Sequence, residues 1–160
     1  MTARVLIIDD LETNLQILDA KLNQEYYITF TATSGLEGIE ILKSQKIDVI
    51  LLDCMMPNLD GFETCKLIKN NPLTMNIPII LVTALSSIED KILGLKAGAD
   101  DFLTKPVNDI ALFTRLKSLS SLKKMIDELE LRNNTNASAA LSTTEILYDY
   151  SLGKIVILND

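Results

Sequence analysis

Five side chains that could handle a phosphoryl group stand at the ends of short apolar runs. They are Asp9 and Asp10 after residues 5–8, Asp53 after residues 49–52, Thr83 after residues 77–82, and Lys105 after residues 101–104. Taken alone, an aspartate in such a place is most often a helix cap or a turn residue. Because the pattern recurs at four runs, it indicates that carboxylates, a hydroxyl and an ammonium meet at one site.

The acidic members of this set predict a metal site. Neighbouring carboxylates repel one another and raise the cost of ionisation, so a pocket that holds them favours a divalent cation. Oxygen ligands suit Mg²⁺, and Mn²⁺ is possible at the same ligands. We expect Asp10 and Asp53 to bind the ion directly, and the backbone carbonyl of Met55 to add a third protein ligand. Asp9 is expected to act through water.

Phosphoryl transfer is the chemistry that suits such a pocket. A carboxylate such as Asp53 can attack phosphorus to form an acyl phosphate, while a metal neutralises charge on the transferring group. Lys105 would pair with one phosphoryl oxygen as a point charge, and Thr83 would donate a hydrogen bond to another. A cis Lys105–Pro106 peptide bond would direct the ammonium inward.

The elements that must position these residues alternate between strand and helix. Short apolar runs predict strands over residues 5–8, 27–32, 49–52, 77–82 and 101–104. Leucine and isoleucine at helical spacing predict helices over 15–22, 36–42, 62–68 and 88–95, with a fifth starting near Asn108. Ser86 and Ser87 are candidate caps of the fourth helix, which should end near Gly98. This order predicts an α/β fold, a doubly wound parallel sheet with helices on both faces.

Composition limits the classes of protein to which the chain can belong. The formal charge of −7 argues against a broad nucleic-acid surface, so we expect no nucleic-acid partner for this chain. No apolar run approaches the ~18 residues of a membrane span, and a first run at Val5 leaves no room for a signal peptide. Cys54 and Cys65 form no CxxC pair and the chain has no histidine, which disfavours a disulfide framework or a zinc site. A cytoplasmic location is the simplest expectation.

The motifs resemble those of the CheY-like receiver domains of two-component response regulators. The matching residues are VLIIDD (5–10), LLDCMMPNLDGFE (51–63), IILVTAL (79–85) and GADDFLTKP (98–106). The resemblance covers about residues 3–118 and implies the flavodoxin-like strand order 2-1-3-4-5. It also implies that Asp53 accepts a phosphoryl group from a sensor histidine kinase or a phosphotransfer protein. In the same pattern Asp9 and Asp10 are the acidic pair, Thr83 is the switch hydroxyl and Lys105 contacts the phosphate.

Phe102 stands where the resemblance places an aromatic switch residue. One interpretation is a ring that swings inward when Thr83 moves toward the phosphoryl group. The other is an ordinary strand aromatic packed in the core. Because phenylalanine has no hydroxyl, any switching at Phe102 must act through packing.

The chain after residue 110 extends beyond a minimal receiver, which we place at residues 1–120. Apolar residues recur at helical spacing, which predicts an extension of the fifth helix over 121–133; the positions are Leu112, Leu116, Leu119, Leu122, Ile126 and Leu129. This extension is expected to contact a second domain or a second chain, or else to pack on its own domain. Residues 134–153 are small and polar, which predicts a linker.

The last seven residues, KIVILND (154–160), repeat the character of RVLIIDD (4–10). We interpret them as the first strand of a second receiver, although a simple edge strand or chance would also account for them. Two receivers joined by a helix resemble the PleD type of response regulator, whose output is a diguanylate cyclase. That resemblance implies a phosphorylation-dependent homodimer and an output domain elsewhere in the parent chain. Residues 1–160 alone should catalyse only the phosphorylation and dephosphorylation of their own aspartate.

Three alternatives remain at this stage. A haloacid-dehalogenase-like phosphatase also uses an aspartate nucleophile and Mg²⁺, but it expects a second aspartate two positions later, where this chain has Met55. A pseudo-receiver would keep the fold without phosphorylation, yet none of the five chemical positions is lost. A stand-alone phosphocarrier of receiver type is disfavoured by the long C-terminal extension.

Overall fold

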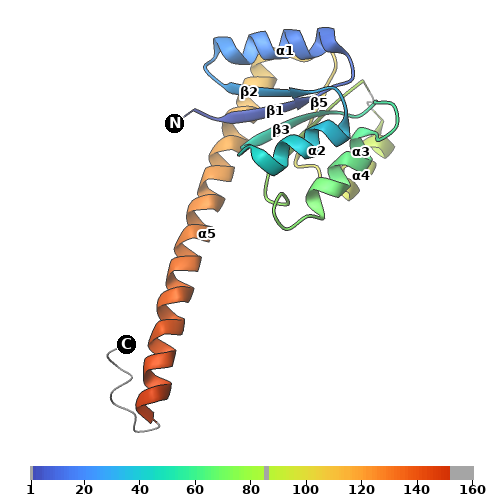
Figure 1. Cartoon of the computed structure of the whole chain (residues 1–160). Helices are drawn as coiled ribbons and strands as arrows, with labels where there is room; N and C mark the ends of the chain where they lie inside the picture. The colour runs from blue at the N-terminus through green and yellow to red at the C-terminus, as the bar shows by residue number, and fades with distance from the viewer. Residues whose placement is uncertain (1, 85–86, 152–160) are drawn as a thin grey trace. The chain divides into compact units, whose positions relative to one another are not determined.

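The protein was studied as a computed structural model, which describes residues 2–84 and 87–151, with residues 137–151 described by their backbone alone. Strands and helices alternate strictly along the chain (Figure 1). The strands are β1 (Arg4–Ile8), β2 (Ile28–Ala32), β3 (Val49–Asp53), β4 (Ile79–Thr83) and β5 (Asp101–Thr104). The helices are α1 (Glu12–Gln24), α2 (Gly35–Ser44), α3 (Gly61–Lys69), α4 (Ile88–Ala97) and α5 (Asp109–Ser151).

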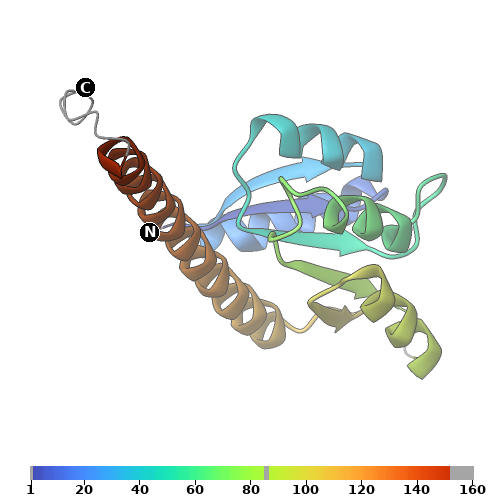
Figure 2. The same cartoon turned by 90° about the horizontal axis from the view of Figure 1, so that it is seen from below.

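The five strands form one parallel sheet in the order β2-β1-β3-β4-β5, which confirms the flavodoxin-like topology. Figure 2 shows the strands side by side and pointing the same way, so their carboxyl ends share one edge. β2 lies on one side of β1, whereas β3, β4 and β5 follow on its other side. This switch in strand order falls between β1 and β3, and ligands of such sheets bind there, beyond the carboxyl ends of the strands. β4 includes Thr83 itself, so the hydroxyl lies within the strand rather than just after it.

Each face of the sheet has its own apolar core, because side chains alternate between the faces along a strand. In β3, Ile50 and Leu52 pack in a cluster that includes Cys65 and Ile68 of α3 and Ala97 of α4. Val49 and Leu51 face the other way, with buried residues of α1 and α5; these are Leu15, Leu22, Leu112 and Leu116. Figure 1 shows α1 on one side of the sheet and α2, α3 and α4 on the other. Full burial of one such side chain stabilises the fold by ~2 kcal/mol, so the central strands are fixed on both faces.

Side-chain caps start four of the helices where the chain leaves the sheet. The side chains of Ser34, Asp60, Ser87 and Asn108 each accept a hydrogen bond from a backbone N–H three residues later. Ser87 is one of the two predicted caps of α4, and Ser86 lies outside the described residues. Gly98 ends α4 in the left-handed conformation, with φ of 95°, which glycine adopts without steric cost.

The segment predicted as a linker has a helical backbone through Ser151. A helix can also join two domains, so the role of residues 134–153 as a linker stays a prediction. No proline or glycine interrupts the sequence from residue 107 to residue 152. Alanines at 137, 139 and 140 also favour a helix, so local propensity outweighs the polar composition. Residues 154–160, the proposed first strand of a second receiver, lie outside the described residues, and that interpretation stays a prediction.

The chain divides into two compact units, Met1–Lys124 and Met125–Asp160. The first unit contains the whole sheet and every predicted site residue. Within the described residues, no helix combines the length and the apolar character that a membrane crossing requires.

Candidate functional site

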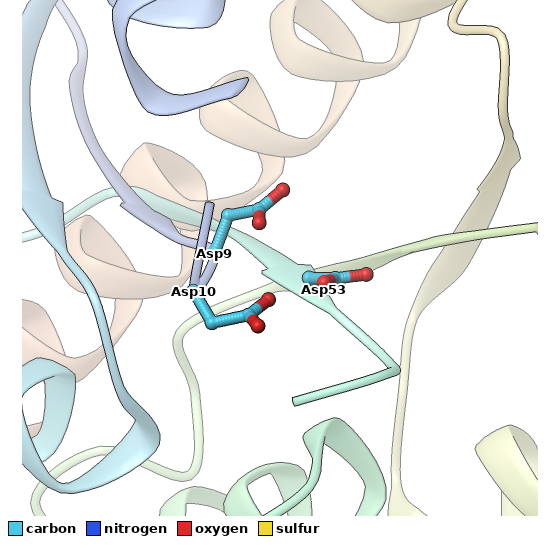
Figure 3. Close-up of side chains that lie close together, drawn as sticks. All are labelled: Asp9, Asp10 and Asp53. Atoms are coloured by element: carbon cyan, nitrogen blue, oxygen red, sulfur yellow. The ribbon is translucent and has the colours of Figure 1, made fainter. Parts of the chain in front are cut away.

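Three carboxylates meet at the carboxyl edge of the sheet. Asp9 and Asp10 follow β1, and Asp53 is the last residue of β3. Because Ile8 and Leu52 are partners in the parallel ladder, the residues that follow them emerge side by side. One carboxylate oxygen from each aspartate lies within 4.8 Å of the others (Figure 3). The predicted acidic cluster is therefore present, with Asp9 and Asp53 buried and Asp10 half-buried.

Asp9 is anchored by the start of α1. Its Oδ1 accepts a hydrogen bond from the backbone N–H of Leu11 at 2.9 Å, and its Oδ2 accepts one from Asn14 Nδ2 at 3.1 Å. Of the two neighbouring aspartates, Asp9 is therefore the one whose side chain is tied to the start of the first helix. Asp10 makes no contact of this kind with α1 in the hydrogen bonds of the described region, which suits a residue that ligates an ion directly. Sequence reasoning missed Asn14, whose only signal was its place in the first turn after the acidic pair.

Lys105 brings a positive charge to the carboxylates. Its Nζ lies 3.2 Å from Asp53 Oδ1 and 3.7 Å from Asp9 Oδ2. The Lys105–Pro106 peptide bond is cis. The lysine ammonium is a compact charge on a flexible side chain, so it can change partners from one oxygen anion to another nearby. The predicted convergence of the ammonium and the carboxylates is therefore present in the fold, and the contact of Lys105 with a phosphoryl oxygen stays a prediction.

Burial and like charge make Asp53 a poorly solvated carboxylate. Desolvation raises the pKa of Asp53 above its ordinary value, and repulsion from Asp9 raises it further. Lys105 opposes both effects with its charge and a hydrogen bond, and the Met55 N–H contributes a long hydrogen bond of 3.5 Å. A divalent cation would favour the ionised carboxyl, as Lys105 does. The hard oxygen donors of the three aspartates fit Mg²⁺ or Mn²⁺.

Thr83 ends β4 on the strand next to Asp53. Its carbonyl accepts the backbone N–H of Lys105 at 2.8 Å, and the Cys54 N–H donates to Val82 O at 3.2 Å. These two bonds continue the sheet ladder past the strand ends. Since Asp53 pairs with Val82, Cys54 stands beside Thr83, and its thiol is a hydrogen-bond partner of the Thr83 side chain. Sequence reasoning gave Cys54 no role, because a cysteine that follows an apolar run looks like another core residue.

Phe102 pairs with Leu81 across the β4–β5 ladder and is partly buried against the α2–α4 face of the sheet. Both interpretations of Phe102 agree with this packing, so its role as a switch stays a prediction. Met55 turns its side chain largely to solvent. The metal contact of its carbonyl also stays a prediction.

A surface hollow of ≈300 Å³ opens beside the acidic cluster. It is bounded by α1 and by the loop after β5, with Asp9 and Lys105 in its wall and Ile17, Leu18 and Val107 around them. This hollow therefore leads from the surface to Asp9 and Lys105 past apolar side chains.

Comparison with known proteins gives one consistent result. The model of the response regulator receiver domain family matches residues 5–117. Response regulator PleD of Caulobacter vibrioides (strain NA1000 / CB15N) is 42% identical over 161 residues, which cover 100% of this chain and 36% of PleD. The transcriptional regulatory protein PhoP of Bacillus subtilis (strain 168) is 37% identical over 119 residues, 74% of this chain and 49% of PhoP. The chain thus spans between a third and a half of the length of these relatives.

Solved structures agree with these relatives. Chemotaxis protein CheY4 of Vibrio cholerae superposes with a TM-score of 0.71 at 31% identity, over 74% of this chain and 99% of that one. The receiver domain of a Pseudomonas aeruginosa PAO1 sensor histidine kinase, solved with a magnesium ion in its active-site cleft, gives 0.70 at 27% identity. That match covers 76% of this chain and 99% of the other.

Proposed function

The chain belongs to the response regulator receiver family, and from this premise we propose that Asp53 accepts a phosphoryl group from a histidine kinase or a phosphotransfer protein. The convergence of Asp9, Asp10, Asp53 and Lys105 at one sheet edge is the observation that carries the proposal. Residues 1–160 contain no histidine, so a donating phosphohistidine must lie outside this segment.

The transfer makes an acyl phosphate on Asp53. An oxygen of the ionised carboxylate attacks the phosphorus of the phosphohistidine, the P–N bond breaks, and the imidazole leaves with the electron pair. Lys105 Nζ, already 3.2 Å from Asp53 Oδ1, is placed to follow the negative charge onto a phosphoryl oxygen. Thr83 can donate its hydroxyl hydrogen to another phosphoryl oxygen once it turns away from the Cys54 thiol.

Mg²⁺, or Mn²⁺ in its place, would be held by Asp10, Asp53 and the carbonyl of Met55. The ion would neutralise charge on the transferring group. Asp9 would act through water, which agrees with the hydrogen bonds that already occupy both of its oxygens. The magnesium in the cleft of the related Pseudomonas receiver supports this ion.

The acyl phosphate would switch the conformation of the domain. Thr83 would move toward the phosphoryl group, and the Phe102 ring would swing inward on the same face of the sheet. In a PleD-like parent chain the switch would favour a homodimer and so bring two output domains together. The output would be a diguanylate cyclase with a second receiver between, and the identity to PleD over the whole of this chain supports that assignment. Two buried free cysteines, Cys54 and Cys65, suit action in a reducing cytoplasm.

Intact mass after incubation with acetyl phosphate and Mg²⁺ tests the phosphoacceptor. We expect a gain of one phosphoryl group in the wild type and in Asp109→Asn, a control that changes an exposed aspartate at the start of α5. Asp53→Asn should show no gain. Absence of phosphorylation in the wild type with every donor would make the domain a pseudo-receiver, and phosphorylation of Asp53→Asn would move the acceptor elsewhere.

Two further measurements separate the regulatory alternatives. The mass in solution, with and without beryllofluoride and Mg²⁺, should double on activation if the domain is a dimer switch. A phosphorylated domain of unchanged mass would fit a stand-alone phosphocarrier. The full-length parent chain, given GTP and Mg²⁺, should form cyclic di-GMP faster after phosphorylation; a parent that forms none would remove the cyclase assignment.

A further inference from the structure

The ring of Phe102 lies against Gly94, a residue of α4 without a role in the site described above. A Cβ atom on Gly94 would overlap the ring edge at Cε1 and Cζ and would come within 3.0 Å of Leu81 Cδ1. Gly94 is buried inside the helix, where glycine is less favourable than alanine. The helix itself therefore gains nothing from a glycine here, whereas the ring depends on it for space.

This contact lies on the same face of the sheet as the switch hydroxyl. Phe102 stands beside Leu81 in the β4–β5 ladder, and Thr104 stands beside Thr83. Since side chains alternate along each strand, Phe102 and Leu81 share a face with Thr83, one row back from the carboxyl edge. The ring is partly buried there in the cluster that α2, α3 and α4 cover.

A second place is open to the ring. Phe102 also lines a surface hollow of ≈330 Å³ between α4, β5 and α5, whose wall includes Lys91, Ala111 and Arg115. A ring displaced from Gly94 can turn into this hollow and become more exposed. The ring then has two alternative positions, packed and displaced. The equilibrium between them depends on the free space next to the Gly94 Cα atom.

We propose that Gly94 is a positioning residue for the switch, because its missing side chain leaves room for the packed position of the Phe102 ring. The proposal rests on the proposed function, in which the inward ring and the movement of Thr83 toward a phosphoryl group are coupled. A methyl group at residue 94 displaces the ring. By linkage, the methyl group then lowers the affinity of any ligand at Asp53 whose binding requires the packed position of the ring.

Exposure of the ring can be measured without any phosphoryl group. The four phenylalanines of the chain are replaced by 4-fluorophenylalanine, and the Phe102 resonance is assigned by its loss in Phe102→Leu. The difference in the fluorine chemical shift of this resonance between H₂O and D₂O then reports how far the ring is exposed to solvent. We expect a larger shift in Gly94→Ala than in the wild type, and an unchanged shift in Lys96→Ala, an exposed control on the same helix.

Coupling to the site is measured with beryllofluoride and Mg²⁺ in the whole 160-residue chain. Overpacking a core typically has a cost that corresponds to about a tenfold change in binding, so half-saturation should need about tenfold more beryllofluoride in Gly94→Ala. In the Phe102→Ala background the same Gly94→Ala change should have a much smaller effect, because the ring that it would displace is gone and only the contact with Leu81 Cδ1 remains. If Gly94→Ala alone does not fold, the double variant must fold, as circular dichroism will show.

An unchanged ring exposure in Gly94→Ala, an equal loss of binding in both backgrounds, or a double variant that does not fold overturns the role of Gly94. A wild type that binds no beryllofluoride would count against the proposed function instead. In that case the fluorine measurement still decides whether Gly94 seats the ring.

Discussion

Replacement of Lys105 by methionine tests the electrostatics of the site. The change keeps much of the aliphatic stem but removes the ammonium that lies 3.2 Å from Asp53 Oδ1 and 3.7 Å from Asp9 Oδ2. At an effective dielectric constant of ~20, a pair of unit charges at these distances attracts by roughly 5 kcal/mol. Lys105 is 31% exposed at its side chain, so solvent screening and its own desolvation remove most of that gross attraction.

We therefore expect Lys105→Met to lower the free energy of unfolding by about 2 kcal/mol at pH 7 in Mg²⁺-free buffer, between the values for surface and buried pairs. With a denaturant slope of about 2 kcal/mol/M, the urea midpoint should fall by about 1 M. With saturating Mg²⁺ the loss should shrink to less than half, because a dication neutralises the same carboxylates.

Lys91→Met, which changes an exposed lysine of α4, is the matched control. Its urea midpoints without and with Mg²⁺ should stay within about 0.3 M of the wild-type values. An equal loss for Lys105→Met with and without Mg²⁺ would refute the reasoning. It would show that the lysine stabilises the fold through its stem rather than through charge.

Three other predictions concern residues of the site and of the core beside it. Because the folded-state pKa of Asp53 is raised, its contribution to stability is full below the unfolded pKa of about 3.9 and is lost as pH rises through the folded value. Asp53→Asn should therefore raise the Mg²⁺-free urea midpoint at pH 7 and leave it nearly unchanged at pH 4; a lowered midpoint at pH 7 would contradict this. Burial raises the pKa of the Cys54 thiol to about 11 and that of Cys65 to about 12, so neither should react with iodoacetamide in the folded protein at pH 8, and both should react in urea, as intact mass will show. Asp10→Asn should abolish the Mg²⁺-induced rise in melting temperature, a stabilisation worth about 2.7 kcal/mol at a hundredfold excess over Kd in the wild type; an unchanged rise would remove Asp10 from the metal ligands.

The sheet and the acidic cluster were predictable from sequence because both depend on regular geometry. A parallel strand that is buried on both faces has a continuous apolar run, and the next residue must emerge at the carboxyl edge. That rule alone brings Asp9, Asp10 and Asp53 together, whatever the loops do. Lys105 follows from the same rule.

The details that escaped prediction depend on contacts rather than on period. Asp9 anchors α1 because a backbone N–H two residues on and an amide five residues on both reach it, and no pattern distinguishes it from Asp10. The neighbours Cys54 and Thr83 are set by the register of two strands, which the sequence leaves open. Beyond residue 133, polar composition favoured a linker, whereas the absence of any helix breaker kept the backbone helical.

The ladder bonds beyond the strand ends bear on the timing of a signal. The N–H groups of Cys54 and Lys105 donate to Val82 O and Thr83 O, so the backbone of the site belongs to the sheet. In the proposed switch, motion between states would then be mostly a change of side-chain torsions at Thr83 and Phe102, and such changes are fast compared with collective rearrangements of loops or domains. The duration of a signal would accordingly be set by the hydrolysis of the acyl phosphate, with the conformation following that chemistry almost at once.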